Sequence, residues 1–312
     1  MGAMQLHFQI MPSDMEHAGK ARAPLTGMPA MLPLTIRLHE RMEPLEASWR
    51  ALEAENTLSL HQSYDWCRAW VESHPSKLLI VEGVSGGRTH LILPLEIVRR
   101  GPLRIARFLA APFSNINTGL YSEDFRFLAA PPRLRQAFDA VRREFARHCD
   151  IFVLENMPLD WRGAQNPFSD LPSVLNQNAS FQLELFADFE RTLAQVNARR
   201  RRKKFRASER RLIALGGYEH IVAEAGEESR RVLETFLQQK ATRFEAMGLP
   251  DVFHDGATRD FFRRLVSVPE AGESYPLQLH AIRLTGENAG RIAAIAGLSR
   301  KGDHVICQFG SI

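Results

Sequence analysis

The sequence LQLHAIRLTGENAGRIAAIAGLSRKGDHVICQFG, residues Leu277–Gly310, predicts three consecutive β-strands. Leu277–Leu284 alternates apolar and polar residues, Arg291–Leu298 is small and apolar, and His304–Phe309 follows. Two short segments rich in Gly, Asn and Asp separate these strands, and such residues permit the chain reversal of a hairpin. A three-stranded meander cannot bury two faces by itself, so we expect upstream elements to cover it.

Upstream of the meander, the second half of the chain has the pattern of one strand and two helices. Tyr218–Val222 is predicted as the strand, and Glu227–Met247 and Thr258–Val268 as the helices, because their apolar residues recur at helical spacing. The order is therefore strand, helix, helix, strand, strand, strand. The first half of the chain, residues 31–187, begins with the same order. A helix and two more strands complete it. This repetition predicts an α/β protein with two similar lobes.

The lobes are expected to span residues 31–187 and 188–312. Residues 1–30 have no periodic apolar pattern, so we predict a disordered segment there. Within the first lobe, Arg133–Arg147 is predicted as one amphipathic helix and Phe181–Phe186 as a strand. The polar loop Pro112–Glu123 has two interpretations, an exposed surface loop or the lining of a site.

Composition limits the classes of protein to which the chain can belong. Of its 312 residues, 45% are hydrophobic and 24% are charged, which is ordinary for a soluble globular protein. No apolar run approaches the roughly 18–20 residues that a membrane-spanning helix needs. The first residues also lack the charged-then-apolar order of a signal peptide. We therefore expect a cytoplasmic protein without a transmembrane segment.

The three cysteines are Cys67, Cys149 and Cys307. They are odd in number and far apart, which argues against a disulfide framework and fits a reducing compartment. The sequence contains no CxxC or HxxxH pair. We therefore expect no metal site.

The strongest local feature is a basic segment. Residues 199–211 hold nine Lys or Arg and one acid, a net charge of +8, while the whole chain carries +4. We predict a helix here, capped by Asn197 and stopped at Gly216 and Gly217. Its expected buried stripe consists of four residues: Phe205, Ser208, Leu212 and Leu215.

Two interpretations of this basic helix remain open. It is either a solvated face whose long side chains cover a sheet edge, or a contact surface for a phosphate-bearing or otherwise anionic partner. Anionic glycan, CoA, tRNA and a membrane surface are the candidate partners, with Arg200, Arg202 and Lys204 as candidate contacts. Aromatic residues are limited to Phe205 within the segment, so specific DNA recognition is not expected.

Several short stretches, in this order and at this spacing, resemble one known family. They are Gln62-Ser63-Tyr64-Asp65-Trp66 before Trp70; Leu93-Pro94-Leu95; Asn156-Met157-Pro158 with Asn166-Pro167; Leu215-Gly216-Gly217 after the basic helix; Lys240-Ala241-Thr242-Arg243-Phe244 with Gly248; Asp251-Val252-Phe253; and Arg291-Ile292-Ala293-Ala294. The chain resembles the CelD/BcsL-type acetyltransferases, which are FemAB-like proteins of the GNAT superfamily with tandem lobes. The resemblance implies two GNAT-like lobes, each a mixed central sheet flanked by helices.

The resemblance also implies an activity. It is the transfer of an acyl group, with acetyl expected, from an acyl-CoA such as acetyl-CoA to an amine or hydroxyl of a sugar, polysaccharide or cell-envelope precursor. Such chemistry needs a base for the attacking amine, and Glu245 and Asp251 are the candidates. The alternative is that Asp251 caps a loop and Glu245 is solvated. Lys240 and Arg243 are candidates for binding an acidic substrate.

The resemblance departs from the family at the C-terminal end of the sequence. In the family, a loop resembling Ser-Pro-Gly and a helix follow the strand that ends here at Phe309 and Gly310, and they hold the CoA pyrophosphate. We therefore expect an incomplete, C-terminally truncated second lobe that binds acyl-CoA weakly. Backbone contacts of Phe309, Gly310 and Ser311 with the pantetheine arm are expected on the edge strand.

Two other functions are consistent with the sequence. One is a catalytically inactive binding or scaffold module in polysaccharide biosynthesis, which the missing pyrophosphate loop favours. The other is Fem-like aminoacyl transfer from charged tRNA, with the basic helix holding the RNA.

Overall fold

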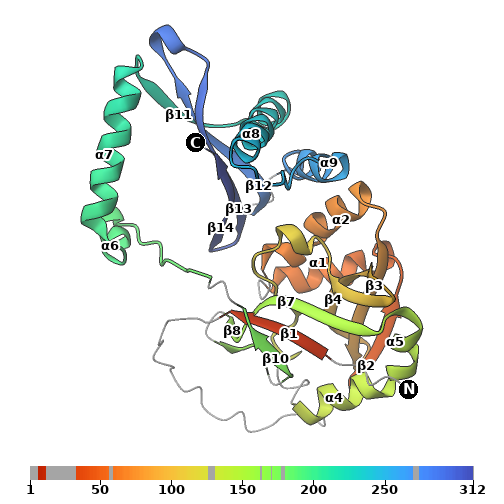
Figure 1. Ribbon diagram of the computed structural model, residues 1–312. Coiled ribbons are helices and arrows are strands. Elements are labelled where there is room, and N and C mark those ends of the chain that lie inside the picture. The colour runs from red at the N-terminus through yellow and green to blue at the C-terminus, as the bar shows by residue number, and fades with distance from the viewer. Residues whose placement is uncertain are drawn as a thin grey trace. The chain divides into compact units, whose positions relative to one another are not determined.

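The computed structural model describes residues 6–11, 33–55, 59–125, 131–161, 164–169, 171–176, 180–269 and 274–311 (Figure 1). The chain forms two compact units, Met1–Ser180 and Phe181–Ile312. The division falls after residue 180, whereas the sequence places it after residue 187. Each unit is a mixed α/β structure built on its own central sheet.

The sheet of the first unit has the order β10-β1-β7-β5-β4-β3-β2, and β6 pairs with β4. From β2 to β5 the neighbouring strands are antiparallel, whereas β7 is parallel to β5, and β1 is parallel to both β7 and β10. The strands are β1 (Leu6–Met11), β2 (Thr35–His39), β3 (Lys77–Ser85), β4 (Arg88–Arg100), β5 (Leu103–Phe108), β6 (Leu120–Tyr121), β7 (Ile151–Pro158) and β10 (Ser173–Leu175). A separate two-stranded ribbon consists of β8 (Asp160–Trp161) and β9 (Ala164–Gln165).

Helices connect these strands at two places in the first unit. Between β2 and β3 lie η1 (Glu43–Leu45), α1 (Glu46–Ala54), η2 (Leu60–Gln62) and α2 (Tyr64–Ser73). After β5 come η3 (Ala111–Phe113), α4 (Pro131–Ala140) and α5 (Arg142–His148). The α4–α5 segment is the crossover that a parallel β5–β7 pair requires.

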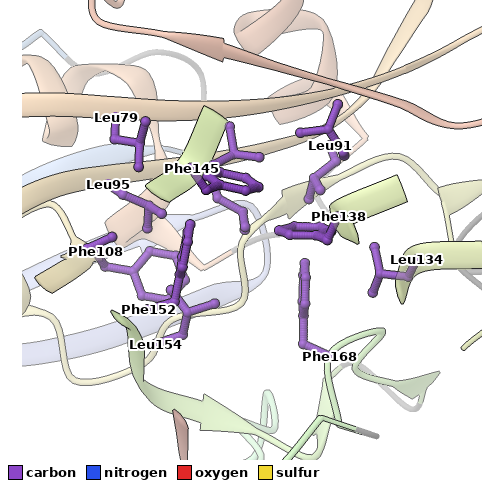
Figure 2. Packing of buried hydrophobic residues seen from close by; sticks show 14 of the residues in the cluster. Leu79, Leu91, Leu95, Phe108, Leu134, Phe138, Phe145, Phe152, Leu154 and Phe168 are labelled. Atoms are coloured by element: carbon purple, nitrogen blue, oxygen red, sulfur yellow. The ribbon is translucent and has the colours of Figure 1, made fainter. Parts of the chain in front are cut away.

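Aromatic side chains join this crossover to the sheet. Phe145 of α5 meets Phe152 of β7 edge to face at 4.9 Å between ring centroids, and it stacks on Phe138 of α4 at 5.6 Å. Figure 2 shows these rings beside Phe108 and Leu95 in the same apolar cluster. All five side chains are buried. Their burial holds α4 and α5 against the sheet.

The second unit has a four-stranded antiparallel sheet in the order β11-β12-β13-β14. Its elements are α6 (Phe189–Ala194), α7 (Ala198–Ala214), β11 (Tyr218–Val222), α8 (Glu227–Ala246), α9 (Gly256–Leu265), β12 (Tyr275–Leu284), η4 (Gly286–Asn288), β13 (Ile292–Lys301) and β14 (His304–Ser311). The predicted meander is confirmed, with each strand within a few residues of its expected limits. The predicted strand before it and both helices are also present.

The repeated order is confirmed as well. In each unit a strand is followed by two helices and a three-stranded antiparallel meander, and the first strand pairs with the first strand of the meander. Thus β2, β3, β4 and β5 correspond to β11, β12, β13 and β14 in order and direction.

Three sequence predictions about local structure were wrong. Leu6–Met11, expected to be disordered, is strand β1, because parallel pairing with β7 supplies hydrogen bonds that no local pattern reveals. The other residues of the segment 1–30 lie outside the described residues. The helix expected over 133–147 divides at Val141. The Val141 N–H donates to the carbonyl of Phe138, three residues earlier, and not to the residue four positions earlier as in a continuous α-helix. The expected strand at residues 181–186 finds no partner strand, and Phe181 is 93% exposed.

A close approach between β13 and β14 shapes the core of the second unit. The Phe309 ring stacks on Phe236 of α8 at 4.1 Å and meets Phe262 of α9 edge to face at 5.5 Å. Opposite Phe309 in the ladder is Gly297. A Cβ added there would lie 2.5 Å from the ring of Phe309. The absence of a side chain at Gly297 therefore allows the ring to lie flat between the sheet and the helices.

We predict that Gly297→Ala destabilises the second unit by about 1–3 kcal/mol, the usual cost of overpacking a core. Phe309 cannot move away easily, since Phe236 and Phe262 hold its ring on two sides. The matched control is Gly256→Ala, where an added Cβ meets nothing within 4 Å. Calorimetric unfolding of both variants measures the difference. Equal stability of the two variants would contradict this account of the core.

Candidate functional site

The second half of α8 reaches the C-terminal end of β14 through one polar side chain. Gln239 donates from Nε2 to the Ile292 carbonyl at 3.0 Å, and its Oε1 accepts from the Ser311 hydroxyl at 2.6 Å. These two bonds fix the helix to both β13 and β14. Gln239 was not among the site residues predicted from the sequence. Its spacing of three residues from Phe236 places this polar side chain next to the apolar face of the helix, which is the pattern that could have revealed it.

The three expected cofactor contacts lie on this same strand end. The Phe309 side chain belongs to the aromatic core, and the Ser311 side chain is buried against Gln239. Gly310 is exposed and has no side chain. What this segment offers to a ligand is therefore its backbone. Among the described residues, β14 pairs with β13 alone, so one edge of β14 presents its N–H and C=O groups without a strand partner.

Lys240 and Arg243 lie one helical turn apart, next to Gln239 on α8. The Lys240 ammonium sits over the rings of Phe236 and Phe244, at 5.8 and 5.7 Å from their centroids. Burial, with a smaller contribution from the charge of Arg243, lowers the pKa of Lys240 below its ordinary value. The role of Lys240 and Arg243 in binding an acidic substrate stays a prediction.

The two candidate bases differ in their surroundings. Glu245 is exposed on the last turn of α8. Asp251 lies in the following loop, where its Oδ1 accepts from the Phe253 N–H at 2.9 Å and its carbonyl oxygen accepts from His254 Nδ1 at 2.6 Å. Asp251 thus caps the loop, which is the alternative to a catalytic role that its sequence context also predicts. It positions Phe253, whose ring meets Phe236 edge to face at 5.3 Å.

The basic helix α7 is exposed along its length. Asn197 caps it by accepting from the Arg200 N–H at 3.1 Å, as the sequence predicts. The predicted buried stripe was wrong: Phe205 is 63% and Leu215 is 46% exposed, and no residue of the helix is buried. Asn288 of η4 donates from Nδ2 to the Leu215 carbonyl at 2.9 Å, which joins the end of α7 to the β12–β13 connection without covering Phe205.

The charges of α7 are mostly unpaired in the described part of the chain. Arg202 forms an ion pair with Glu190 of α6. No carboxylate of a described residue lies within ion-pair distance of the other Lys and Arg side chains of α7: Arg199, Arg200, Arg201, Lys203, Lys204, Arg206, Arg210 and Arg211. The helix therefore presents a concentrated positive surface to solvent or to a partner.

In the first unit, the position equivalent to the open edge of β14 is occupied by the chain itself. Pairing of β5 with β7 ends at Arg107 and Val153. Beyond it, Asn117 donates from its backbone N–H to the Asn156 carbonyl and from Nδ2 to the Glu155 carbonyl, both at 2.9 Å. Asn117 is fully buried. Around Asn117 the loop 112–123 is therefore a buried segment bonded to β7, next to the place where the pairing of β5 with β7 ends.

A second polar side chain secures this loop. Gln62 donates from Nε2 to Asn117 Oδ1 at 2.6 Å, and its Oε1 accepts from the Thr118 N–H at 3.0 Å. Because every one of these groups is buried and bonded, opening the loop would leave several polar atoms without partners. The first unit is therefore closed where the second unit is open.

Residues 199–312 match the family model of an acetyltransferase (GNAT) domain. This region is a GNAT-type acetyltransferase domain. It begins within α7 and includes the whole sheet of the second unit, and it makes the protein an acyltransferase. No curated protein matches the chain.

The described residues contain no group of three or more His, Cys, Asp and Glu side chains placed to hold a metal ion. Likewise, none of the helices in the described ranges has the length and apolar character needed to cross a membrane.

The exposed charge of α7 leads to a prediction about polyanion binding. Replacing Arg200, Arg202 and Lys204 with Gln should weaken heparin binding and reduce the slope of log Kobs against log[salt] by about 2–3, because each neutralised anionic group releases nearly one counterion. Fluorescence titration at several salt concentrations measures the slope. The control replaces the exposed Arg135, Arg142 and Arg143 of the first unit. Binding that is absent, or insensitive to salt, would leave α7 as a solvated face.

Proposed function

We propose that the second unit transfers an acyl group, with acetyl expected, from acyl-CoA to an amine or hydroxyl of a sugar, polysaccharide or cell-envelope precursor. The match of residues 199–312 to an acetyltransferase domain carries the proposal. The stretches that resemble the CelD/BcsL-type, FemAB-like acetyltransferases support this subtype and this class of acceptor.

The edge of β14 is the proposed position of the donor. The pantetheine arm of acyl-CoA contains two amide groups, which can pair with an exposed strand as another strand would. Backbone groups at Phe309, Gly310 and Ser311 are the proposed contacts, while the side chains of Phe309 and Ser311 hold the strand in place. The bonded loop at Asn117 supports assigning the donor to the second unit and not to the first.

The proposed reaction proceeds by direct attack of the acceptor on the thioester, without a covalent enzyme intermediate. The acceptor amine or hydroxyl gives up its proton to a carboxylate, directly or through water, and attacks the thioester carbonyl carbon. The tetrahedral species then collapses, and the CoA thiolate leaves. Glu245, exposed on the last turn of α8, is the proposed base, with Asp251 as the second candidate. Lys240 and Arg243 are proposed to hold an acidic group of the substrate.

The donor position is testable by hydrogen exchange. With saturating acetyl-CoA, backbone amides of residues 304–311 should gain protection, because the donor would pair with the edge of β14. Amides of 103–121 in the first unit should not change. Protection confined to the first unit would move the donor site there and contradict the proposal.

The proposed base leads to a kinetic prediction. Glu245→Gln should lower kcat by about 10²–10⁴ with little change in KM for acetyl-CoA, if this carboxylate accepts the proton. Asp251→Asn keeps an oxygen that can accept the Phe253 N–H, so it tests charge while preserving the loop. The control is Glu287→Gln on the β12–β13 hairpin, an exposed acid. Full activity of both Glu245→Gln and Asp251→Asn would show that neither residue is the base.

One observation favours a second candidate function. The exposed positive surface of α7 suits a nucleic acid or another polyanion, and this supports aminoacyl transfer from charged tRNA as the alternative reaction. Supplying aminoacyl-tRNA and acetyl-CoA separately to the same acceptor distinguishes the two donors. Transfer from neither donor, together with acceptor binding, would support the scaffold function.

A further inference from the structure

A pocket lies at the other end of α8, on the same face of the sheet as that helix. Its volume is about 490 Å³, within the range of small-molecule sites. The lining comes from three parts of the second unit: the first half of α8, strands β11 and β12, and the start of β13. The lining residues include Glu228 and Arg231 of α8, Arg283 of β12, and Arg291 and Ile292 at the start of β13.

Three of these residues are arginines, and each comes from a different element. Arg231 lies on α8, Arg283 on β12 and Arg291 at the residue before β13. Because the elements are fixed by the sheet and by the packing of α8, the three guanidinium groups are brought to one pocket by the fold and not by sequence proximity.

Acidic groups neutralise only part of this charge. Arg283 donates from Nε to Glu219 Oε1 at 2.7 Å, and its Nη1 lies 3.5 Å from Glu228 Oε1. The other oxygen of Glu228 accepts from the Glu224 N–H at 2.9 Å. Both carboxylates are therefore engaged with Arg283 or with the backbone. They hold the Arg283 guanidinium in one orientation.

The other two arginines lack such partners. No carboxylate in the described ranges lies within ion-pair distance of Arg231 or Arg291. Arg291 donates from Nη1 to the neutral Asn288 Oδ1 at 3.1 Å, which orients its side chain without compensating its charge. The pocket thus combines one oriented, paired arginine with two arginines whose charge is uncompensated.

We propose that this pocket binds the phosphoryl group of a small molecule. A phosphoryl group carries a charge of about −1.5 to −2 at neutral pH, which matches the two arginines that lack carboxylate partners. Its several acceptor oxygens also suit the planar, multiple N–H donors of arginine better than they suit lysine. The pocket has room for an organic group beyond the phosphoryl, because an oxyanion alone would not fill its volume.

This site is separate from the proposed acyl-transfer site. Arg231 and Lys240 are nine positions apart on α8, which corresponds to about 13 Å along the helix axis. The proposal therefore does not depend on which donor or acceptor the acyltransferase uses. Arg283 could have been noticed in the sequence, since it occupies a position in β12 that alternation assigns to the same face as Leu279 and Ala281, both of which are buried.

The test is isothermal titration of the full chain with inorganic phosphate, with chloride and acetate at matched ionic strength. We expect saturable binding of phosphate and none of chloride or acetate. Arg231→Gln and Arg291→Gln should each weaken phosphate binding about tenfold or more, since each removes charge-assisted hydrogen bonds. The double variant should lose saturable binding. Thermal unfolding checks that each variant is folded.

The control is Arg230→Gln, which changes an exposed arginine of the same helix that is absent from the pocket lining. It should bind phosphate as the unaltered protein does. Three results would overturn the proposal: an equal response to phosphate and acetate, unchanged binding in the double variant, or an equal loss of binding in Arg230→Gln. Because no acyl transfer is measured, failure here is distinguishable from failure of the acyltransferase proposal.

Discussion

The second unit depends on the contact between one aromatic ring and one glycine. Phe309 lies flat over Gly297, and this lets α8 approach the sheet closely enough for Phe236 to stack on the same ring. The position of α8 then determines where the side chains along this helix lie. Its second half brings Gln239 to the end of β14, and its first half brings Arg231 to the pocket beside Arg283. If α8 lay farther from the sheet, its side chains would reach neither the end of β14 nor the pocket.

The two units show how one topology can differ in what it offers a ligand. Both contain a strand, two helices and an antiparallel meander in the same order. In the first unit the sheet continues to β7, and Asn117 and Gln62 fill the place where β5 and β7 stop pairing. In the second unit β14 is an edge strand among the described residues. The difference lies in what stands beside the last strand of the meander and not in the shared order of elements, so function has to be argued from the site.

Charge is distributed unevenly over the second unit, and its two positive regions are of different kinds. On α7 the cations follow one another along the sequence and are exposed on a helix with no buried residue. This arrangement suits an extended polyanion. In the pocket, by contrast, Arg231, Arg283 and Arg291 converge from separate elements, and Glu219 and Glu228 orient one of them. Such a concave arrangement suits a small, compact anion.

The sequence by itself determined the features that depend on local pattern. Apolar periodicity and turn residues predict β11 to β14, α8 and α9, and the repeated order predicts two similar units, because these patterns arise within a few residues of each other. Features that depend on distant partners were decided by the tertiary structure alone. Leu6–Met11 is a strand because it pairs with β7 and β10, and Phe205 of α7 is 63% exposed although its spacing favours burial. The convergence of Arg231, Arg283 and Arg291 likewise depends on the tertiary structure, because the three residues come from separate elements and their separation along the chain does not indicate their distance in space.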